Sequence, residues 1–328
     1  MSDSPTLPVL RTPSFVQMPL PAAGDTAGEI HAALAAPSAS IAPRFFYDEL
    51  GSRLFAAIMA LPEYYPTRTE AAIVEQHLPE IAEAARIEGG TLVDLGAGTC
   101  EKAARLFDAL KPAQYAAVDI SADFLRASLD CLQRQFPAMA MLGVGTDFSR
   151  VLTLPGEVSP HKRLFFYPGS SIGNFTPDDA VAFLTQLREH GGADGALLIG
   201  VDLVKPSAVL EPAYDDALGV TAAFNLNVLV HLNRIAGTDF HLRDWRHLAY
   251  FNERDSRIEM HLEATRSLEV RWRGGRRRFE AGECIHTENS YKYTPQSFAA
   301  LLARAGYAPP TTWTDAQGWF GLFLARPR

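Results

Sequence analysis

The sequence is poor in cysteine. Its 328 residues include three, Cys100, Cys131 and Cys284, and their spacing matches no metal-binding pattern. A low, odd count argues against a disulfide framework and is typical of proteins in a reducing cytoplasm. The nine histidines form neither an HxxxH nor an HExxH pattern. We therefore expect no zinc site and no metal cofactor.

Long apolar runs are also missing. No stretch of about 18 consecutive apolar residues exists, so the sequence predicts no membrane span. The first 27 residues contain five prolines and lack a cationic region followed by an apolar one, so we interpret them as a loose arm rather than a signal peptide. We expect residues 1–15 to be a disordered tail. These features favour a cytoplasmic protein.

Positive charge is scarce. The chain has 30 Lys and Arg against 38 Asp and Glu, a net charge of −8. This balance argues against a nucleic-acid partner, which usually needs a basic face. The basic run from Arg271 to Arg278 contains Gly274 and Gly275, which mark a turn, so we interpret it as a solvated hairpin tip. We expect a monomer whose partner is a small molecule.

Short apolar strands alternate with amphipathic helices over much of the chain. Strands this apolar predict a parallel sheet that is buried on both faces. The fold class is therefore α/β, with a doubly wound, Rossmann-like sheet. The expected strands occupy residues 91–96, 115–120, 140–147, 163–170, 195–204 and 318–327.

The alternation stops after residue 204 and resumes near residue 291. The simplest interpretation is one doubly wound domain, residues 70–204 and 291–328, interrupted by an insert. The insert and the N-terminal arm, residues 205–290 and 16–69, would form a second α+β domain over the carboxyl ends of the strands. Ligands of open α/β sheets bind outside those ends.

Two helices are expected in the arm and just after it. Residues 44–60 have apolar residues at helical spacing. Pro66 should interrupt the helical pattern. Thr67 and Glu70 match a capping box, Thr-x-x-Glu, which would open a second helix to about Ala85.

The segment "VDLGAGTCEK" lies between the first expected strand and a helix. Gly96 and Gly98 permit close approach of the backbone to a ligand. The third glycine of a dinucleotide GxGxxG is absent, because Glu101 occupies its position. That substitution disfavours NAD, since the third glycine serves close packing of helix and strand. Asp94, just before the loop, suits a ligand that carries a cation better than a pyrophosphate.

Acids also follow the next two strands. Asp119 ends the second strand about 20 residues after the loop, where an acid can bind both ribose hydroxyls. Asp147 and Phe148 end the third strand, and they offer an acceptor for an adenine amino group and a ring to stack on it. Together with the glycine loop, these residues match S-adenosylmethionine better than NAD.

Several motifs together carry a family resemblance. They are "YDELGSRLFAAIMALPEYYPTRTE", "DLGAGTCEK", "YPGSSIGNFTP", "AYDDALGVTAAFNLNVL", "IEMHL" and "TENSYKY". From about residue 40 onward the chain resembles the histidine Nα-methyltransferases of the ergothioneine pathway. The resemblance implies a class I methyltransferase domain with a substrate domain. It also implies stepwise trimethylation of the α-amino group of histidine to hercynine, with S-adenosylmethionine as the methyl donor.

The resemblance also implies site residues. Tyr47 and Asn174 would surround the substrate amine as the catalytic pair, and Asn174 and Tyr214 would bind the carboxylate. Gly169 would make a close backbone contact. For the cofactor, the matching positions are Gly96, Gly98, Lys102, Asp119, Asp147 and Phe148.

The imidazole would be recognised by Tyr64, Glu288 and Ser290, between apolar walls from Phe55 and Met260. Tyr65 is the alternative to Tyr64 in the "EYYP" corner. Glu288 and Ser290 are two residues apart, so on an extended segment their side chains point the same way. Asn289 should face the other way and have a structural role.

Other functions stay open. A related N-methyltransferase could act on another aromatic amino acid such as tryptophan, although an indole has one N–H donor and no acceptor nitrogen for Glu288 and Ser290 to share. A Rossmann-type dehydrogenase is disfavoured by Glu101. A silent S-adenosylmethionine-binding protein would not need the acceptor-side residues.

Overall fold

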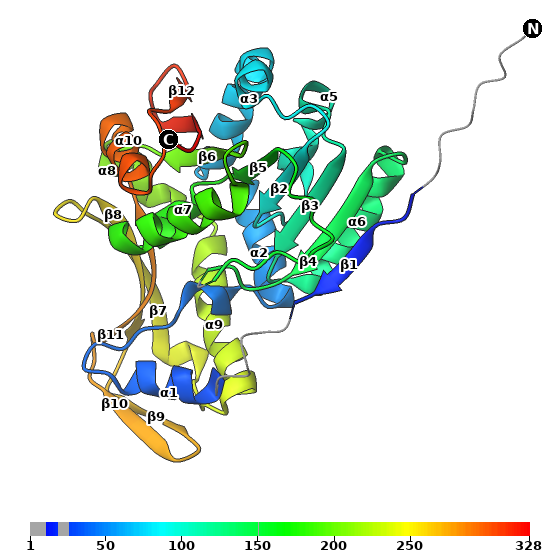
Figure 1. Ribbon diagram of the computed structural model, residues 1–328. Helices are drawn as coiled ribbons and strands as arrows, with labels where there is room; N and C mark the ends of the chain where they lie inside the picture. Colours follow the sequence, from blue (N-terminus) through cyan, green and yellow to red (C-terminus); the bar gives the residue numbers. More distant parts are fainter. Residues whose placement is uncertain (1–10, 19–25, 150) are drawn as a thin grey trace, which may run out of the picture.

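The computed structural model describes residues 11–18, 26–149 and 151–328. Within these residues eight strands form one large sheet: β1 (Ser14–Gln17), β2 (Thr91–Leu95), β3 (Gln114–Asp119), β4 (Ala140–Gly145), β5 (Arg163–Tyr167), β6 (Ala196–Asp202), β12 (Thr311–Thr314) and β13 (Phe320–Ala325). Their order is β1-β4-β3-β2-β5-β6-β13-β12 (Figure 1). Neighbouring strands pair in parallel from β1 to β6, whereas β13 and β12 are antiparallel. The expected α/β sheet is confirmed.

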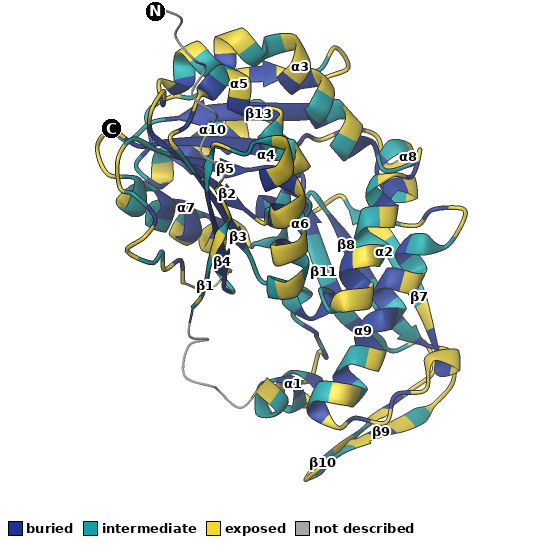
Figure 2. Cartoon of the chain, turned by 90° about the vertical axis from the view of Figure 1, so that its right-hand side faces the viewer, coloured by how far each residue is buried: buried dark blue, intermediate teal, exposed yellow. Residues whose placement is uncertain are grey.

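Helices cover both faces of this sheet, as the buried strands in Figure 2 illustrate. On one face the core includes apolar residues of α7 (Pro177–Gly191) and α10 (Pro295–Arg304). On the other face it includes residues of α3 (Tyr65–Ala85), α4 (Glu101–Ala104), α5 (Phe107–Leu110) and α6 (Ala122–Gln135). Burial on both faces explains why the strands are continuous apolar runs.

A second unit has its own hydrophobic core, formed by the N-terminal arm and the insert. Its helical elements are α1 (Thr26–Ala35), η1 (Pro43–Phe46), α2 (Glu49–Met59), α8 (Ser207–Leu210), η3 (Glu211–Ala213), α9 (Val220–Ala236) and η4 (Leu242–Asp244). Its strands are β7 (Trp245–Asn252), β8 (Arg257–Ala264), β9 (Leu268–Trp272), β10 (Gly275–Phe279) and β11 (Cys284–Tyr291). β11, β8 and β7 form an antiparallel sheet, and β9 and β10 form a hairpin. We propose that this unit is the second domain.

The insert leaves and rejoins the large sheet at one place. Leu203 and Tyr293 form a parallel bridge. The backbone N–H of Val204 donates to the carbonyl of Tyr293 at 3.0 Å. The two ends of the insert are therefore held together directly beside the sheet.

The expectation of a disordered tail over residues 1–15 is wrong for Ser14 and Phe15, and residues 1–10 lie outside the described residues. Ser14 and Phe15 belong to β1, whose residues pair with β4 at the edge of the large sheet. The Arg126 guanidinium lies 3.6 Å from the centroid of the Phe15 ring. Val16, expected with the second domain, is part of the same strand, because β4 offers an open edge in register.

The expected helix over residues 44–60 is interrupted. η1 ends at Phe46, and α2 begins only at Glu49. Asp48 is the N-cap of α2, and its side chain accepts a hydrogen bond from the backbone N–H of Gly51 at 2.8 Å. A cap of this kind starts a new helix and leaves Tyr47 outside both helical segments.

The capping box expected at Thr67 is also wrong. α3 begins at Tyr65, with Pro66 in its first turn and no side-chain cap. Pro66 is tolerated there because the first helical N–H groups have no partner within the helix. The Glu70 carboxylate instead accepts from the backbone N–H of Gly169 at 2.9 Å. In the described ranges no helix is both long and apolar enough to cross a bilayer.

Candidate active site

Two adjoining cavities lie where the second unit meets the carboxyl ends of the parallel strands. The larger has a volume of about 690 Å³, and the smaller about 50 Å³. Every residue expected to bind the cofactor lines the larger cavity: Gly96, Gly98, Lys102, Asp119, Asp147 and Phe148. Every residue expected around the substrate lines the smaller one: Tyr47, Phe55, Tyr64, Gly169, Asn174, Tyr214, Met260, Glu288 and Ser290. Six residues line both: Tyr47, Phe55, Tyr64, Gly169, Ser171 and Asn174.

The glycine loop after β2 turns sharply against β3. Gly96 and Gly98 have φ angles of 71° and 51°, which glycine adopts readily. The N–H of Gly98 donates to the Asp119 carboxylate at 2.9 Å, and the N–H of Ser121 donates to its other oxygen at 2.9 Å. Burial raises the pKa of Asp119 despite these bonds. The loop and the acid are thus fixed relative to each other.

Asp94 lies at the end of β2 and lines the larger cavity. The Tyr115 hydroxyl donates to its Oδ2 at 2.8 Å. Its Oδ1 is buried and has no hydrogen-bond partner among the described residues. Burial raises the pKa of Asp94 to about 7. A cationic group in this cavity would satisfy the unpartnered oxygen, and the ammonium of S-adenosylmethionine is such a group.

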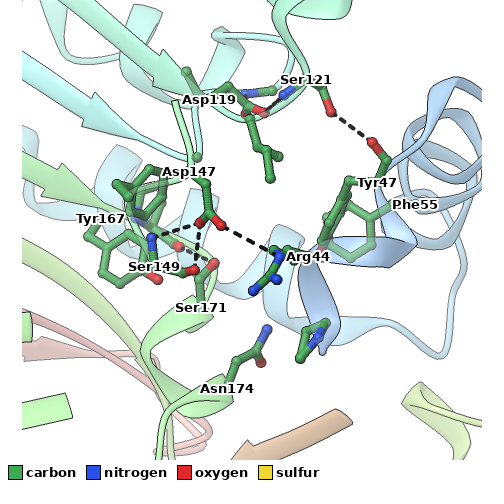
Figure 3. A pocket seen from close by; sticks show the side chains of 18 of the residues that line it. Arg44, Tyr47, Phe55, Asp119, Ser121, Asp147, Ser149, Tyr167, Ser171 and Asn174 are labelled. Atoms are coloured by element: carbon green, nitrogen blue, oxygen red, sulfur yellow. Dashed lines mark hydrogen bonds and ion pairs between the residues drawn. The ribbon is translucent and has the colours of Figure 1, made fainter. Parts of the chain in front are cut away.

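Asp147 follows β4 and connects this end of the strand to the N-terminal arm (Figure 3). Its Oδ1 accepts from the backbone N–H of Ser149 at 3.0 Å, and its Oδ2 lies 3.8 Å from Nε of Arg44. Arg44 also pairs with Glu29 of α1 at 2.6 Å. Sequence reasoning missed Arg44, because a single arginine in a helical segment carries no signal of a contact this distant along the chain.

Lys102 and Glu70 support the wall that the two cavities share. The Lys102 ammonium lies 2.8 Å from one Glu70 oxygen, and the N–H of Gly169 donates to the other at 2.9 Å. Gly169 has a φ of 77°, and a Cβ there would lie 3.1 Å from the Lys102 nitrogen. A side chain at Gly169 would therefore crowd the site.

Aromatic rings from the arm and the insert form one side of the smaller cavity. Tyr47 and Phe55 pack edge to face at 5.8 Å, Phe55 and Tyr64 at 6.3 Å, and Tyr64 and Tyr214 at 6.4 Å between ring centroids. Burial raises the pKa of Tyr47, Tyr64 and Tyr214 well above the ordinary value. These phenols stay protonated near neutral pH. Tyr65 faces away and donates to Asp202 instead.

A bulge in β11 sets the direction of its polar side chains. His286 pairs with His261 and Glu288 pairs with Met260, so Thr287 is an extra residue in the ladder. Because of that extra residue, buried Ile285 and cavity-lining Glu288 face the same side although they are three residues apart. Asn289 contacts His286 at 2.9 Å on the other side, as expected.

Glu288 is the residue in the smaller cavity whose charge can change near neutral pH. Burial raises its pKa to about 7, although Lys292 and a hydrogen bond from Asn174 oppose the shift. Asn174 lines both cavities, so its side-chain amide offers a ligand there both a donor and an acceptor.

Sequence reasoning left Lys292 unassigned. Its side chain is 0% exposed and lies directly behind Tyr214 and Ser290. A lysine in a polar segment is usually solvated, so only the contacts of the fold reveal this position. In the described part of the chain no group of three or more His, Cys, Asp or Glu side chains is arranged to hold a metal ion.

Comparison with known proteins adds to this geometry. Residues 26–327 match the family model described as histidine-specific methyltransferase, SAM-dependent. The chain is 42% identical to the histidine N-alpha-methyltransferase of Mycolicibacterium smegmatis, over 92% of this chain and 97% of that protein. It is 41% identical to the enzyme of that name from Mycobacterium tuberculosis, over 90% and 93%.

A third relative is the ergothioneine biosynthesis protein 1 of Neurospora crassa. It is 31% identical over 86% of this chain, which matches 32% of that longer protein. The family model spans nearly the whole described chain, and the two mycobacterial relatives align along almost all of their lengths. The chain therefore belongs to the family of histidine-specific, S-adenosylmethionine-dependent methyltransferases.

Proposed function

We propose that this enzyme methylates the α-amino group of L-histidine with S-adenosylmethionine, three times in succession, and so makes hercynine for ergothioneine biosynthesis. One observation carries the proposal: Glu288 and Ser290 line a small pocket that shares Asn174 with the adjoining cofactor cavity. The names of the mycobacterial and fungal relatives support this substrate and this pathway.

The cofactor supplies an activated methyl group on a sulfonium. The protein must then present the lone pair of a neutral amine to that methyl group, and most of the rate enhancement comes from positioning. Asn174 and Tyr47 line both cavities, so they mark the place where the amine meets the methyl donor. The Asn174 amide oxygen accepts an amine N–H and orients the lone pair.

Three methylations require a site that accepts a growing cation. Each cycle replaces an N–H with a methyl group, so hydrogen bonds to the amine are lost while bulk increases. The rings of Tyr47 and Phe55 line both cavities, and their faces favour a methylated ammonium without needing a donor. Burial keeps the Tyr47 and Tyr64 hydroxyls protonated, so these two phenols orient the amine rather than take its proton.

Recognition of the side chain falls to Glu288 and Ser290. Glu288 accepts one imidazole N–H, and Ser290 donates to the other ring nitrogen. A site built to hydrogen-bond its substrate rejects analogues that lack the group far more strongly than an apolar pocket does. Tyr214, whose hydroxyl lies 2.7 Å from that of Ser290, binds the carboxylate on the same side.

Mass spectrometry tests the proposal directly. The purified enzyme, S-adenosylmethionine and each aromatic amino acid are incubated separately, and products that carry one, two and three added methyl groups are sought. We expect all three from histidine and none from tryptophan. Methylation of tryptophan with histidine untouched would contradict the proposed substrate. Asn174→Ala should abolish turnover while calorimetry still detects S-adenosylhomocysteine binding.

We further propose that the enzyme acts as a monomer in the cytoplasm, without a nucleic-acid partner. One chain brings together every residue that we propose to bind the two ligands, so we expect the monomer to be active. Light scattering coupled to gel filtration should give the mass of a single chain. A stable dimer whose dissociation removes activity would contradict the proposal.

A further inference from the structure

A buried charge cluster lies behind Tyr214 and Ser290, which we propose to bind the substrate. Lys292 and Asp202 are 0% and 1% exposed, and their charged atoms lie 2.7 Å apart. Lys205 pairs with the other oxygen of Asp202 at 2.5 Å and is 2% exposed. Two cations therefore share one carboxylate. Burial alone would raise the pKa of Asp202, but Lys292 and Lys205 lower it overall, so the carboxylate is ionised.

The two lysines differ in what else they touch. The Lys292 ammonium donates to the Tyr214 hydroxyl at 2.8 Å and to the Ser290 hydroxyl at 2.7 Å. Its three N–H groups are thus all used, one of them on Asp202. The Lys205 ammonium donates to the Tyr65 hydroxyl and to the Leu203 carbonyl, and neither residue lines a cavity.

The Tyr214 and Ser290 hydroxyls have one proton each to donate. The hydroxyls of Tyr214 and Ser290 lie 2.7 Å apart, so one donates to the other. While that bond lasts, only one of the two O–H groups is left for a ligand. Binding of a carboxylate by Tyr214 and of a ring nitrogen by Ser290 needs both O–H groups. The bond between the hydroxyls must therefore open when such a substrate enters.

Lys292 makes that exchange favourable. It keeps donating to both oxygens when the hydroxyls turn to the ligand, so neither oxygen becomes an unsatisfied buried acceptor. One internal bond is replaced by two bonds to the substrate. Two hydroxyl donors suit an amino acid whose ring has an acceptor nitrogen in addition to its N–H. The Glu288 carboxylate accepts a hydrogen bond from that N–H.

We propose that Lys292 is a positioning residue that holds the Tyr214 and Ser290 hydroxyls as simultaneous donors and thereby selects a substrate ring with an acceptor nitrogen. This inference rests on the proposed methylation of histidine. It assigns a specificity role to a side chain that touches neither cavity.

The test compares Lys292→Met with Lys205→Met, which removes the same charge from the same carboxylate but leaves both hydroxyls untouched. Histidine is followed by its KM and kcat, and phenylalanine, which has no ring nitrogen, by its inhibition constant. Lys292→Met should raise the KM of histidine with a smaller change in kcat. The preference for histidine over phenylalanine should fall by about fivefold or more, the order of one hydrogen bond. Lys205→Met should keep the wild-type preference.

Two further variants separate positioning from loss of folding. In a Ser290→Ala background, Lys292→Met should change the preference no further, because the hydroxyl on which it acts is gone. Lys292→Gln, which supplies uncharged donors, should recover part of the preference if Lys292→Met is too unstable to assay. Equal preference in the wild type and in folded Lys292 variants overturns the inference. A wild-type enzyme that fails to methylate histidine overturns the proposed function instead.

Discussion

Burial sets the protonation of the side chains around both cavities. The phenols of Tyr47, Tyr64 and Tyr214 are kept neutral, whereas the pKa values of Glu288 and Asp94 are brought to about 7. The carboxylates are therefore the groups around the two cavities whose charge responds to conditions near neutral pH. Asp94 lines the larger cavity and Glu288 the smaller one, so we expect each carboxylate to govern a different ligand.

Replacement of Glu288 by alanine should weaken the binding of histidine and leave the binding of the cofactor unchanged. Loss of a hydrogen bond to a charged group costs about 1.5–3 kcal/mol, so the KM of histidine should rise by at least about tenfold. Other aromatic amino acids should bind better, and the affinity for S-adenosylhomocysteine should stay close to that of the wild type. Steady-state kinetics and calorimetry measure the two effects.

Glu259→Ala is the matched control for Glu288→Ala. Glu259 is buried and pairs with Asn289 in the same sheet, but its side-chain partners are Arg257, Tyr250 and His261, and it lines neither cavity. This variant should lower the melting temperature and leave the KM of histidine unchanged. Unchanged histidine kinetics in Glu288→Ala would refute the assignment of Glu288.

Asp94 should make cofactor binding depend on pH. An ammonium beside Asp94 favours the ionised carboxylate, so binding releases a proton when the pH is below the pKa of about 7. The affinity for S-adenosylhomocysteine should therefore increase by about tenfold from pH 6 to pH 8 and level off above that. Asp94→Asn should bind more weakly and lose most of this slope. Calorimetry at several pH values measures it, and an identical slope in the variant would rule the role out.

At single residues, the sequence predicted which side chains surround the site but not how they are held. Tyr64 and Asn174, which were chosen from motif positions, both line the smaller cavity. The roles of Lys292 and Arg44 depend on contacts with residues 78 and 103 positions away, Tyr214 and Asp147. Local sequence carries no record of such contacts, and an isolated lysine or arginine is most often solvated.

Among the secondary-structure elements, α2 has the most direct influence on the site. It begins two residues after Tyr47 and carries Phe55, so its start determines where both rings lie. Asp48 holds that start through Gly51 and also accepts from the Asn227 amide of α9 at 2.8 Å. The cap therefore joins the arm to the insert as well as starting the helix.

Asp48→Ala should destabilise the protein by about 2 kcal/mol, the upper part of the range for loss of an N-cap, because the bond from Asn227 is lost as well. The KM of histidine should rise, since Tyr47 and Phe55 lose their anchor. Urea unfolding measures the first effect. Asp123→Ala, an exposed change in the first turn of α6, is the control and should stay within about 0.5 kcal/mol of the wild type.

Helix boundaries were harder to predict than strands. Apolar runs identified the parallel strands because those strands are buried on both faces. The helical pattern of residues 44–60 did not reveal the break at Asp48, because the spacing of apolar residues continues across it. The Glu70 side chain accepts a hydrogen bond from the distant Gly169 N–H and does not form the capping box that the local sequence predicts. Short β12 and β1 lie at the two edges of the sheet, where sequence signals are weak.

For the molecule as a whole, the two units meet at a shared set of side chains. Asn174 and Gly169 come from the sheet domain, whereas Tyr47, Phe55 and Tyr64 come from the arm and its corner, and all five line both cavities. The Ser121 hydroxyl donates to the Tyr47 carbonyl at 3.2 Å, which joins the cofactor side to the arm. A ligand in one cavity therefore contacts the walls of the other.

Binding of the two ligands should be positively coupled. We expect S-adenosylhomocysteine to contact residues that also line the substrate pocket. Histidine should therefore bind at least about fivefold more tightly in its presence, and the effect must be reciprocal. Titration of histidine by calorimetry with and without S-adenosylhomocysteine measures the coupling. Arg44→Ala, which removes the link between arm and Asp147, should reduce it. Equal histidine affinity in both titrations would contradict this prediction.

The bridge between the two ends of the insert has a consequence for exchanging this segment between related enzymes. Leu203 and Tyr293 are adjacent, so the segment between them leaves and re-enters the sheet domain at one point. Because Tyr214, Met260, Glu288, Ser290 and Lys292 all lie within it, we expect this segment to govern the choice of amino acid. A chimaera that takes this one segment from a relative should inherit that relative's substrate preference while keeping its own cofactor site.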